Sequence, residues 1–376
     1  MAESLYLDHA ATSPVLPEVL DAMMPWLTTE FGNPSSVYGK GRKARHALET
    51  ARGTLAELLG VGPAEIVFTS GASESNNTVL TSGTGGVVTS AVEHEAVLEP
   101  SRRRSGQIIL APNAEGRITP EQLKGVQAEA IGMASFMTVN NELGTVNPVT
   151  ELAEVAHSRG WLFHSDAAQA VRTIDLRPVA ANVDYLSLTG HKFGAPKGIG
   201  LLMVRAGVPH APLIRGGGQE QERRSGTENV AFAVGLSAAL ECAVQNREAF
   251  VARCRSFQEQ LFTGLDTRIP GCVTRISPLQ GASPHINNML LHGKNGLGLD
   301  GEMLILGLDM QGIAVSAGSA CSSGTLKTSH VLAGIGITAE RARGAVRISF
   351  GPQTTANEIE RAVVALSDVV NRMTRG

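Results

Sequence analysis

The sequence lacks any pair of cysteines in the spacing C-x-x-C, and its four cysteines stand far apart. That spacing argues against both a disulfide framework and a zinc knuckle, so we expect free thiols. The chain also lacks a run of about 18 apolar residues that could cross a bilayer. Its N-terminal MAESLYLDHAATSP has no basic start followed by an apolar run, unlike a signal peptide. We therefore expect a cytoplasmic protein.

A strong charge of either sign is missing as well. The formal net charge is -3 over 376 residues, and the three arginines at 102–104 are too few for a polybasic patch. No electrostatic footprint for nucleic acid or for an anionic membrane is present, so we expect neither as a partner. The length suits two domains, or one large α/β domain with an accessory part.

From about residue 60, short apolar or β-branched runs alternate with helix-like segments. Several runs are apolar throughout, which is typical of buried strands in a mostly parallel sheet with helices on both faces. The pattern predicts an α/β layered domain. Residues 41–60, which close on a glycine, predict one of its helices. The strand-like runs are EIVFTS, GVVTSAV, QIILA, IGMASFM, WLFHSDAA, VDYLSLTG and GIGLLMVR.

The C-terminal part has a different pattern. One long alanine-rich helical stretch is predicted from about Asn229 to Leu265, long enough to leave the large sheet. HINNMLLHG, GIAVSAG and AVRISFG then predict strands, and DGEMLILGLD and TANEIERAVVALSDVVNRM predict helices, which together indicate a small α+β domain. We expect a large domain over residues 15–255 and a small domain built from residues 1–14 and 256–376.

Lys192 follows an apolar run, in SLTGHKFGAPKGIG. A loop at the carboxyl edge of a strand presents such a lysine to a crevice, where it could form a Schiff base with a cofactor aldehyde. Asp166, in FHSDAAQA, ends the predicted strand before it. Pyridoxal phosphate uses this pair, because the lysine holds the aldehyde and a carboxylate keeps the pyridine nitrogen protonated. Each residue alone has a more ordinary explanation, as an exposed lysine and a helix cap.

A phosphate site is predicted in FTSGASESNNTVL, where a strand ends, glycine and small hydroxyl residues follow, and a helix begins. Free backbone N–H groups at the N-terminus of a helix can hold a phosphate. Ser73 is the side chain expected there, although an ordinary N-cap would also explain it.

Cys321 lies in SAGSACSSG, a stretch of serine, glycine and alanine. Its thiol could be a nucleophile, a metal ligand or a small group packed in a loop. A single thiol without histidine or cysteine neighbours disfavours the metal site, and we expect no metal. Little side-chain bulk holds this stretch in place, which suits a thiol that must travel. We expect a flexible segment from about Ser316 to Ser329.

Ten motifs occur in the order found in pyridoxal-phosphate-dependent cysteine desulfurases of the NifS/IscS type, and the resemblance covers essentially the whole chain. It implies the type I fold of pyridoxal-phosphate-dependent transferases, with a mostly parallel seven-stranded sheet between helices and a small α+β domain. It also implies conversion of L-cysteine to L-alanine with transfer of sulfur to Cys321 as a persulfide. The motifs are LDHAATSP, GNPSS, SGASESNN, VEHEAV, NNELGTVNP, HSDAAQA, SLTGHKFGAPKGIG, RRSGTENV, SAGSACSSG and VRISFG.

The resemblance also assigns roles around the cofactor. His94 resembles the histidine that stacks on the ring and moves protons, although a lone histidine is more often structural. Asn141 and Gln169 resemble the residues beside the phenolic oxygen, and either could otherwise be a routine turn residue. The expected phosphate contacts are Ala72, Ser73, Thr189 and His191.

Substrate and partner contacts follow from the same resemblance. Arg347 resembles the arginine that fixes the substrate carboxylate, for which a bidentate guanidinium is well suited, with Asn33 as a second contact. Thr227 resembles the threonine that reaches the phosphate of the neighbouring subunit, which implies a homodimer. In the implied mechanism the Cys321 thiolate attacks the substrate sulfur. The other thiols, Cys242, Cys254 and Cys272, are expected to be inert.

The sequence departs from the family at Tyr38, in SVYGKG, where many members carry a histidine, so the contribution of that position is open. Other functions also stay open. The same scaffold could serve an aminotransferase or a selenocysteine lyase. A scaffold protein or persulfide carrier would have no chemical need for Lys192 and Asp166. The expected acceptors are sulfur-acceptor proteins of iron–sulfur cluster assembly, tRNA thiolation or DNA sulfur modification.

Overall fold

A mixed sheet of seven strands forms the centre of the larger part of the protein. The computed structural model describes residues 4–128, 130–317 and 329–375. The strand order is β2-β8-β7-β6-β5-β3-β4, in which β8 runs antiparallel to β7 and β2 and the remaining neighbours are parallel. The strands are β2 (Ile66–Thr69), β3 (Gly86–Ser90), β4 (Ile108–Leu110), β5 (Ile131–Ser135), β6 (Leu162–Asp166), β7 (Tyr185–Thr189) and β8 (Gly200–Val204). The predicted mostly parallel seven-stranded sheet is confirmed, and each apolar run supplies one strand.

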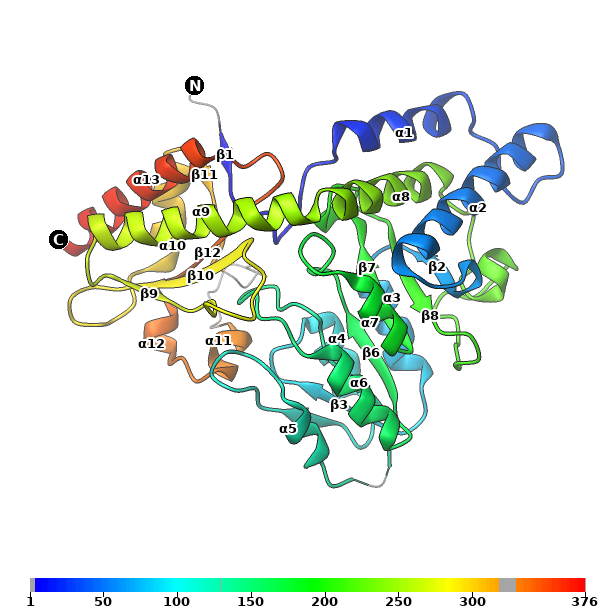
Figure 1. The fold of residues 1–376 in the computed structure, drawn as a ribbon, viewed down its shortest axis with the longest axis horizontal. Coiled ribbons are helices and arrows are strands. Elements are labelled where there is room, and N and C mark those ends of the chain that lie inside the picture. Colours follow the sequence, from blue (N-terminus) through cyan, green and yellow to red (C-terminus); the bar gives the residue numbers. More distant parts are fainter. Residues whose placement is uncertain (1–3, 129, 318–328, 376) are drawn as a thin grey trace.

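Helices cover both faces of this sheet (Figure 1). Side chains alternate along each strand, so that Val67 and Val87 pack beneath α3 and α4, whereas Ile66 and Val88 join the core on the opposite face. This alternation gives the layered arrangement that the sequence predicted. The helices of the larger part are α1 (Pro17–Thr28), α2 (Gly39–Leu59), α3 (Ala72–Ser82), α4 (Glu95–Arg102), α5 (Pro120–Lys124), α6 (Val149–Ser158), α7 (Leu176–Asn182) and α8 (Val230–Gln245), with the 3-10 turn η1 (Pro63–Glu65).

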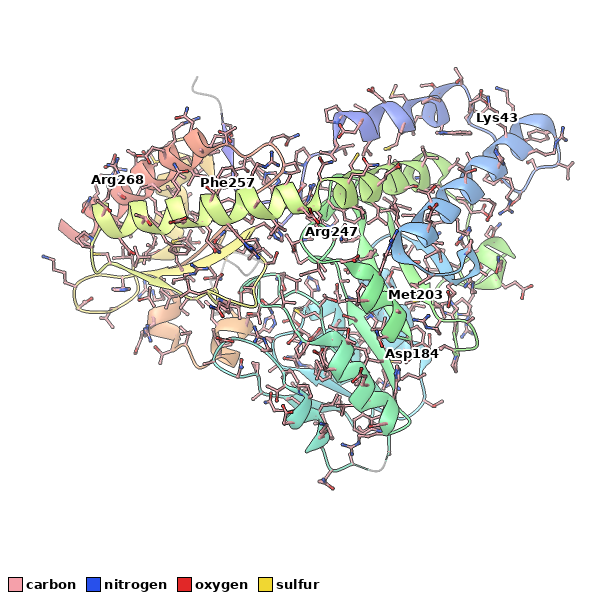
Figure 2. The ribbon with its side chains drawn as sticks, viewed as in Figure 1. Lys43, Asp184, Met203, Arg247, Phe257 and Arg268 are labelled. Carbon is pink, nitrogen blue, oxygen red and sulfur yellow. The ribbon has the colours of Figure 1, made fainter. Side chains whose placement is uncertain are left out.

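The single helical stretch predicted over residues 229–265 is two helices, α8 and α9 (Arg247–Arg268), which meet at Asn246. The Asn246 side chain donates a hydrogen bond to the carbonyl of Cys242 at 2.8 Å. α8 buries Leu236 in the core of the large sheet, whereas α9 buries Phe257 in a second core. Figure 2 shows Arg247 at the junction and Phe257 further along α9. The break lets each helix turn its apolar side toward a different core, a requirement that local propensity does not reveal.

The second core lies among the C-terminal elements and also takes up Leu5 and Leu7 from the N-terminus. Its side chains come from the helices α9, α10 and α13, from a three-stranded antiparallel sheet of order β12-β10-β9, and from the parallel pair β1 and β11. The predicted division at residues 14 and 255 stays a prediction. Among the described residues, no helix is both long and apolar enough to cross a membrane. The elements are β1 (Leu5–Tyr6), β9 (Val273–Arg275), β10 (Ile286–Leu291), α10 (Gly301–Asp309), β11 (Ile313–Ala314), α11 (His330–Gly334), α12 (Ala339–Ala342), β12 (Ala345–Ser349) and α13 (Ala356–Arg375).

Candidate active site

A cavity of about 820 Å³ lies at the carboxyl edge of the large sheet. Segments that follow β2, β3, β5, β6 and β7 supply much of its wall, because these strands are all parallel to one another and end at the same edge. Asp8, near the N-terminus, and Arg347 of β12 complete the lining. The volume falls within the usual range for sites that bind small molecules, roughly 300–1,000 Å³.

The structure brings most of the predicted site residues to this one cavity. Thr227 instead lines a smaller cavity of about 70 Å³, which shares Ser70 and Gly198 with the first. Asn33 lines neither cavity, and its Oδ1 accepts a hydrogen bond from the Ser35 N–H at 2.9 Å. The predicted residues in the large cavity are Ala72, Ser73, His94, Asn141, Asp166, Gln169, Thr189, His191, Lys192 and Arg347.

Three residues singled out from the sequence, Cys321, Tyr38 and Cys254, are not among the described residues that line the large cavity. Cys321 lies outside the described residues, as does most of the flexible segment predicted around it. Tyr38 is exposed at the N-terminus of α2. The Cys254 thiol is buried, and burial raises its pKa to about 12, so this group is protonated and unsuited to attack as a thiolate.

Lys192 ends the 3-10 turn η2 (Gly190–Lys192) that follows β7. Its Nζ donates hydrogen bonds to the carbonyls of Ala10 at 2.6 Å and Ala11 at 2.8 Å. Burial, and next the charge of Arg347, lower the pKa of the Lys192 amine to about 8. The neutral form, which can attack a carbonyl carbon, is therefore more populated near physiological pH than in an ordinary lysine.

Asp166, the last residue of β6, is held from two sides. Its Oδ1 accepts the Ala168 N–H at 2.9 Å, and its Oδ2 accepts the side-chain amide of Asn76 at 2.6 Å. Asn76 belongs to α3 and is fully buried. This residue was not predicted as a site residue, although it lies within the SGASESNN motif. The Asn76 amide fixes the rotation of the carboxylate that faces the cavity.

The turn between β2 and α3 is where the sequence predicts a phosphate site, and it leads into the N-terminus of a helix. Gly71 occupies the N-cap with φ 152°, a conformation that side chains strongly disfavour, and a Cβ there would stand 3.2 Å from the Thr189 Oγ1. Because glycine has no capping side chain, the N–H groups of Ala72 and Ser73 have no hydrogen-bond partner among the described residues. Ser73 is not the N-cap, so the more ordinary explanation for it is wrong.

Two histidines stand on the cavity wall with defined partners. His94 is the exposed N-cap of α4, and its Nδ1 accepts the Ala96 N–H at 3.0 Å, which leaves Nε2 as the protonated nitrogen of the neutral ring. His191 Nδ1 lies 3.1 Å from the Thr12 Oγ1. Burial, followed by the charge of Lys192, lowers the pKa of His191 to about 4, so its ring is neutral, with one nitrogen that donates a hydrogen bond and one that accepts.

Arg347 reaches the cavity from β12 and is almost fully buried. Its Nη2 donates to Asp8 Oδ1 at 2.7 Å, and its Nη1 donates to the Asn141 carbonyl at 2.8 Å. Asp8 was not predicted as a site residue. The only signal for it was its place in LDHAATSP, because the two partners are 339 residues apart in the chain.

The residues present fit a phosphorylated pyridine aldehyde. An amine, a carboxylate and an uncapped helix N-terminus face one cavity, and these match an aldehyde, a ring nitrogen and a phosphate. The side-chain oxygens of Asn76 and Asn141 are buried without a partner among the described residues, so the site leaves polar groups for a ligand to satisfy. Within the same residues, no cluster of three His, Cys, Asp or Glu side chains could hold a metal ion.

Comparison with known proteins gives full-length matches. The family model described as aminotransferase class-V matches residues 5–362. A cysteine desulfurase from Cereibacter sphaeroides is 39% identical over 383 residues, covering 99% of this chain and 97% of that protein. A solved structure named NifS-like protein gives a TM-score of 0.90 at 32% identity and covers 98% of this chain and 100% of its own. The structure named SspA in complex with cysteine gives 0.80 at 34% identity, covering 94% and 100%.

Proposed function

Because this chain belongs to the class-V aminotransferase family, and within it is similar to cysteine desulfurases over its whole length, we propose that it converts L-cysteine to L-alanine and transfers the sulfur to Cys321 as a persulfide. The main support for this proposal is that Lys192, Asp166 and Arg347 all line one cavity. These groups suit an aldehyde cofactor and an amino acid carboxylate at adjacent positions.

Pyridoxal phosphate is the cofactor that these residues would hold. Lys192 would hold the aldehyde carbon, Asp166 the ring nitrogen, and the turn at Ala72 and Ser73 the phosphate, with Thr189 beside it. When bound, this group supplies an electron sink that weakens the bonds at the substrate Cα and, in turn, the bond from Cβ to sulfur.

The protein side chains would then position the substrate and move its protons. Arg347 binds the substrate carboxylate, and its ion pair with Asp8 keeps the guanidinium directed at the cavity. Lys192 Nζ, with its lowered pKa, takes the proton from the substrate Cα. His94, with Nδ1 occupied by the Ala96 N–H, exchanges a proton through Nε2.

The transfer of sulfur from the substrate to Cys321 needs no added oxidant, because its bonds and electrons balance. The Cys321 thiolate attacks the sulfur of the substrate, and an S–S bond forms as the bond from Cβ to sulfur breaks. The electron pair of the broken bond stays on the substrate carbon and is protonated, which completes L-alanine. The persulfide on Cys321 would pass to a sulfur-acceptor protein, for example an iron–sulfur scaffold or a thiolation enzyme.

The experiment that tests this function follows both products. Purified protein reconstituted with pyridoxal phosphate is expected to release alanine from L-cysteine and to gain one sulfur atom at Cys321, measured by mass spectrometry of the tryptic peptide. Cys321→Ala removes the acceptor and should abolish persulfide on the chain, whereas Cys242→Ala is the matched control and should not. Keto acid in place of alanine would indicate an aminotransferase and contradict the proposal.

A homodimer is the second part of this proposal. Leu20, Met24 and Leu27 follow one face of α1 and are exposed together with Phe31, an apolar surface suited to a second copy of this chain. We expect sedimentation velocity to give about twice the 39.4 kDa of one chain. Leu27→Asp is expected to raise the dimer dissociation constant at least about tenfold. Leu279→Asp, at an exposed leucine outside α1, is the control, and a wild-type monomer at micromolar concentration would contradict the dimer.

A further inference from the structure

The segment from Gly216 to Glu228, here called the arm, is part of the connection between β8 and α8 and has an unusual backbone. Three consecutive residues in its 3-10 turn η3 (Gln219–Glu222) have positive φ angles without being glycine, namely Glu220, Gln221 and Glu222, at 50°, 57° and 67°. Side chains disfavour this left-handed region, so neighbouring contacts must hold the turn in place. Thr227, the predicted phosphate contact, lies further along the same arm.

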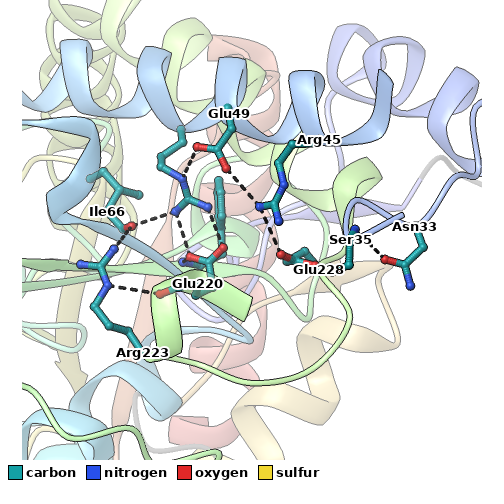
Figure 3. Close-up of polar contacts among 10 residues, drawn as sticks. Asn33, Ser35, Arg45, Glu49, Ile66, Glu220, Arg223 and Glu228 are labelled. Atoms are coloured by element: carbon teal, nitrogen blue, oxygen red, sulfur yellow. Dashed lines mark hydrogen bonds and ion pairs between the residues drawn. The ribbon is translucent and has the colours of Figure 1, made fainter. Parts of the chain in front are cut away.

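A buried ion pair holds this turn against the sheet. Arg52 donates to both carboxylate oxygens of Glu220, at 2.8 Å and 2.6 Å, and both side chains are almost fully buried. Glu220 also accepts the Phe68 N–H at 2.9 Å, and Arg52 donates to the Ile66 carbonyl at 2.8 Å. β2 is the edge strand of the sheet, and these side chains satisfy the backbone groups that a further strand would otherwise bind (Figure 3).

The two arginines that follow the turn reach different targets. Arg223 donates to the carbonyl of Ala64 at 2.6 Å. It also donates to the carbonyl of Ile66 on the edge strand at 3.3 Å, as Figure 3 shows. Arg224 instead forms a bidentate ion pair with Glu74, with Nε to Oε1 at 3.0 Å and Nη2 to Oε2 at 3.3 Å. The left-handed turn therefore directs one arginine to the strand and the next to α3.

Glu74 lies close to the predicted phosphate site, which is formed by the N-terminus of α3. It lies in the first turn of α3, lines the large cavity and accepts the Ser70 N–H at 2.8 Å. Burial by itself would raise its pKa, but the hydrogen bonds from Arg224 and Ser70 outweigh burial and hold the pKa below its ordinary value. The carboxylate is therefore ionised beside a site that must accept a phosphate dianion, and an unpaired negative charge there would repel that ligand.

We infer that Arg224 is a positioning residue for the phosphate site: it neutralises Glu74 and fixes the carboxylate that holds the Ser70 N–H, so that the turn at Gly71 to Ser73 presents its N–H groups to an anion. The inference rests on the proposed cofactor. On this inference the arm supports cofactor binding within its own subunit. The Arg52 and Glu220 pair contributes indirectly, because it holds the left-handed turn that places Arg224 beside Glu74.

The test compares two aldehydes that differ only in the phosphate, namely pyridoxal phosphate and pyridoxal, bound to the cofactor-free protein without cysteine. Arg224→Met is expected to weaken pyridoxal phosphate binding at least about tenfold and to change pyridoxal binding less than about twofold. A general loss of structure would weaken both. Arg223→Met, at the adjacent arginine without a contact to Glu74, is the matched control and should leave the ratio of the two dissociation constants unchanged.

A second substitution separates charge from structure. In Arg224→Met/Glu74→Gln the repelling carboxylate is gone while an amide oxygen can still accept the Ser70 N–H, so the ratio should return to within about threefold of wild type. The inference is overturned if Arg224→Met weakens the binding of both aldehydes equally, if Arg223→Met changes the ratio of the two dissociation constants as much as Arg224→Met does, or if the double variant shows no recovery. A protein that prefers pyridoxal phosphate but yields no alanine from cysteine would contradict the proposed function alone.

Discussion

Replacement of Lys192 by alanine is expected to lower kcat for alanine release from L-cysteine by at least about a thousand-fold. The substitution removes both the covalent hold on the cofactor and the base for the substrate Cα. Burial and the charge of Arg347 lower the pKa of this amine to about 8, so the group lost is one that is partly neutral at the working pH. The visible absorption band of the cofactor bound to lysine should disappear at the same time.

Two further variants sharpen this test. Lys192→Arg keeps a positive charge on the cavity wall but cannot bind an aldehyde covalently, so it should be as inactive as the alanine variant if the amine is the reacting group. Lys124→Ala, at an exposed lysine of α5, should retain wild-type kcat and the visible band. Retention of more than about a tenth of the wild-type kcat in Lys192→Ala would contradict the assigned role.

Glu220→Ala is expected to lower the free energy of unfolding by about 3 kcal/mol. The substitution removes the buried counter-charge of Arg52 and leaves only Glu49, a half-exposed partner whose Oε2 lies 3.0 Å from the Arg52 Nε. Burial by itself lowers the pKa of Arg52, yet the hydrogen bonds and charges of Glu220 and, to a smaller extent, Glu49 outweigh burial and raise that pKa above its ordinary value. The variant also leaves the Phe68 N–H at the sheet edge unpaired and releases the left-handed turn. Urea denaturation at saturating cofactor measures the change.

The control for this prediction is an exposed pair of the same chemistry. Glu360 and Arg268 lie 3.1 Å apart on α13 and α9, and both side chains are about half exposed. Glu360→Ala should therefore cost about 0–1 kcal/mol, since water screens the pair and solvates the arginine that remains. A loss in Glu220→Ala no larger than in Glu360→Ala would contradict a stabilising role for the buried pair.

Local sequence patterns were sufficient to predict the secondary elements that position the site. Apolar runs located the strands of the large sheet. The polar residues at their carboxyl ends are Asp166, the last residue of β6, and Lys192, which follows β7. The glycine and hydroxyl residues around Gly71 likewise indicated the turn at the N-terminus of α3, where the phosphate site is predicted. These features are encoded by neighbouring residues, because burial of a strand and the conformation of a turn depend mainly on local side chains.

The same patterns misjudged or missed what depends on packing. The predicted stretch over 229–265 is interrupted at Asn246 because its halves face two different cores. The partners Asp8 for Arg347 and Asn76 for Asp166 were not predicted, although each lies within a quoted motif. A motif shows that a residue is present but does not show which distant group it contacts.

The sequence by itself determined the α/β architecture, the carboxyl-edge location of the lysine and aspartate, and the resemblance that the family match confirms. Only the tertiary structure decided how those groups are held, through the pairing of Arg347 with Asp8 and of Arg224 with Glu74. The physical reason is that such pairs join segments far apart in the chain. Their geometry is set by the way helices and strands pack around two cores, and no local pattern of residues contains that information.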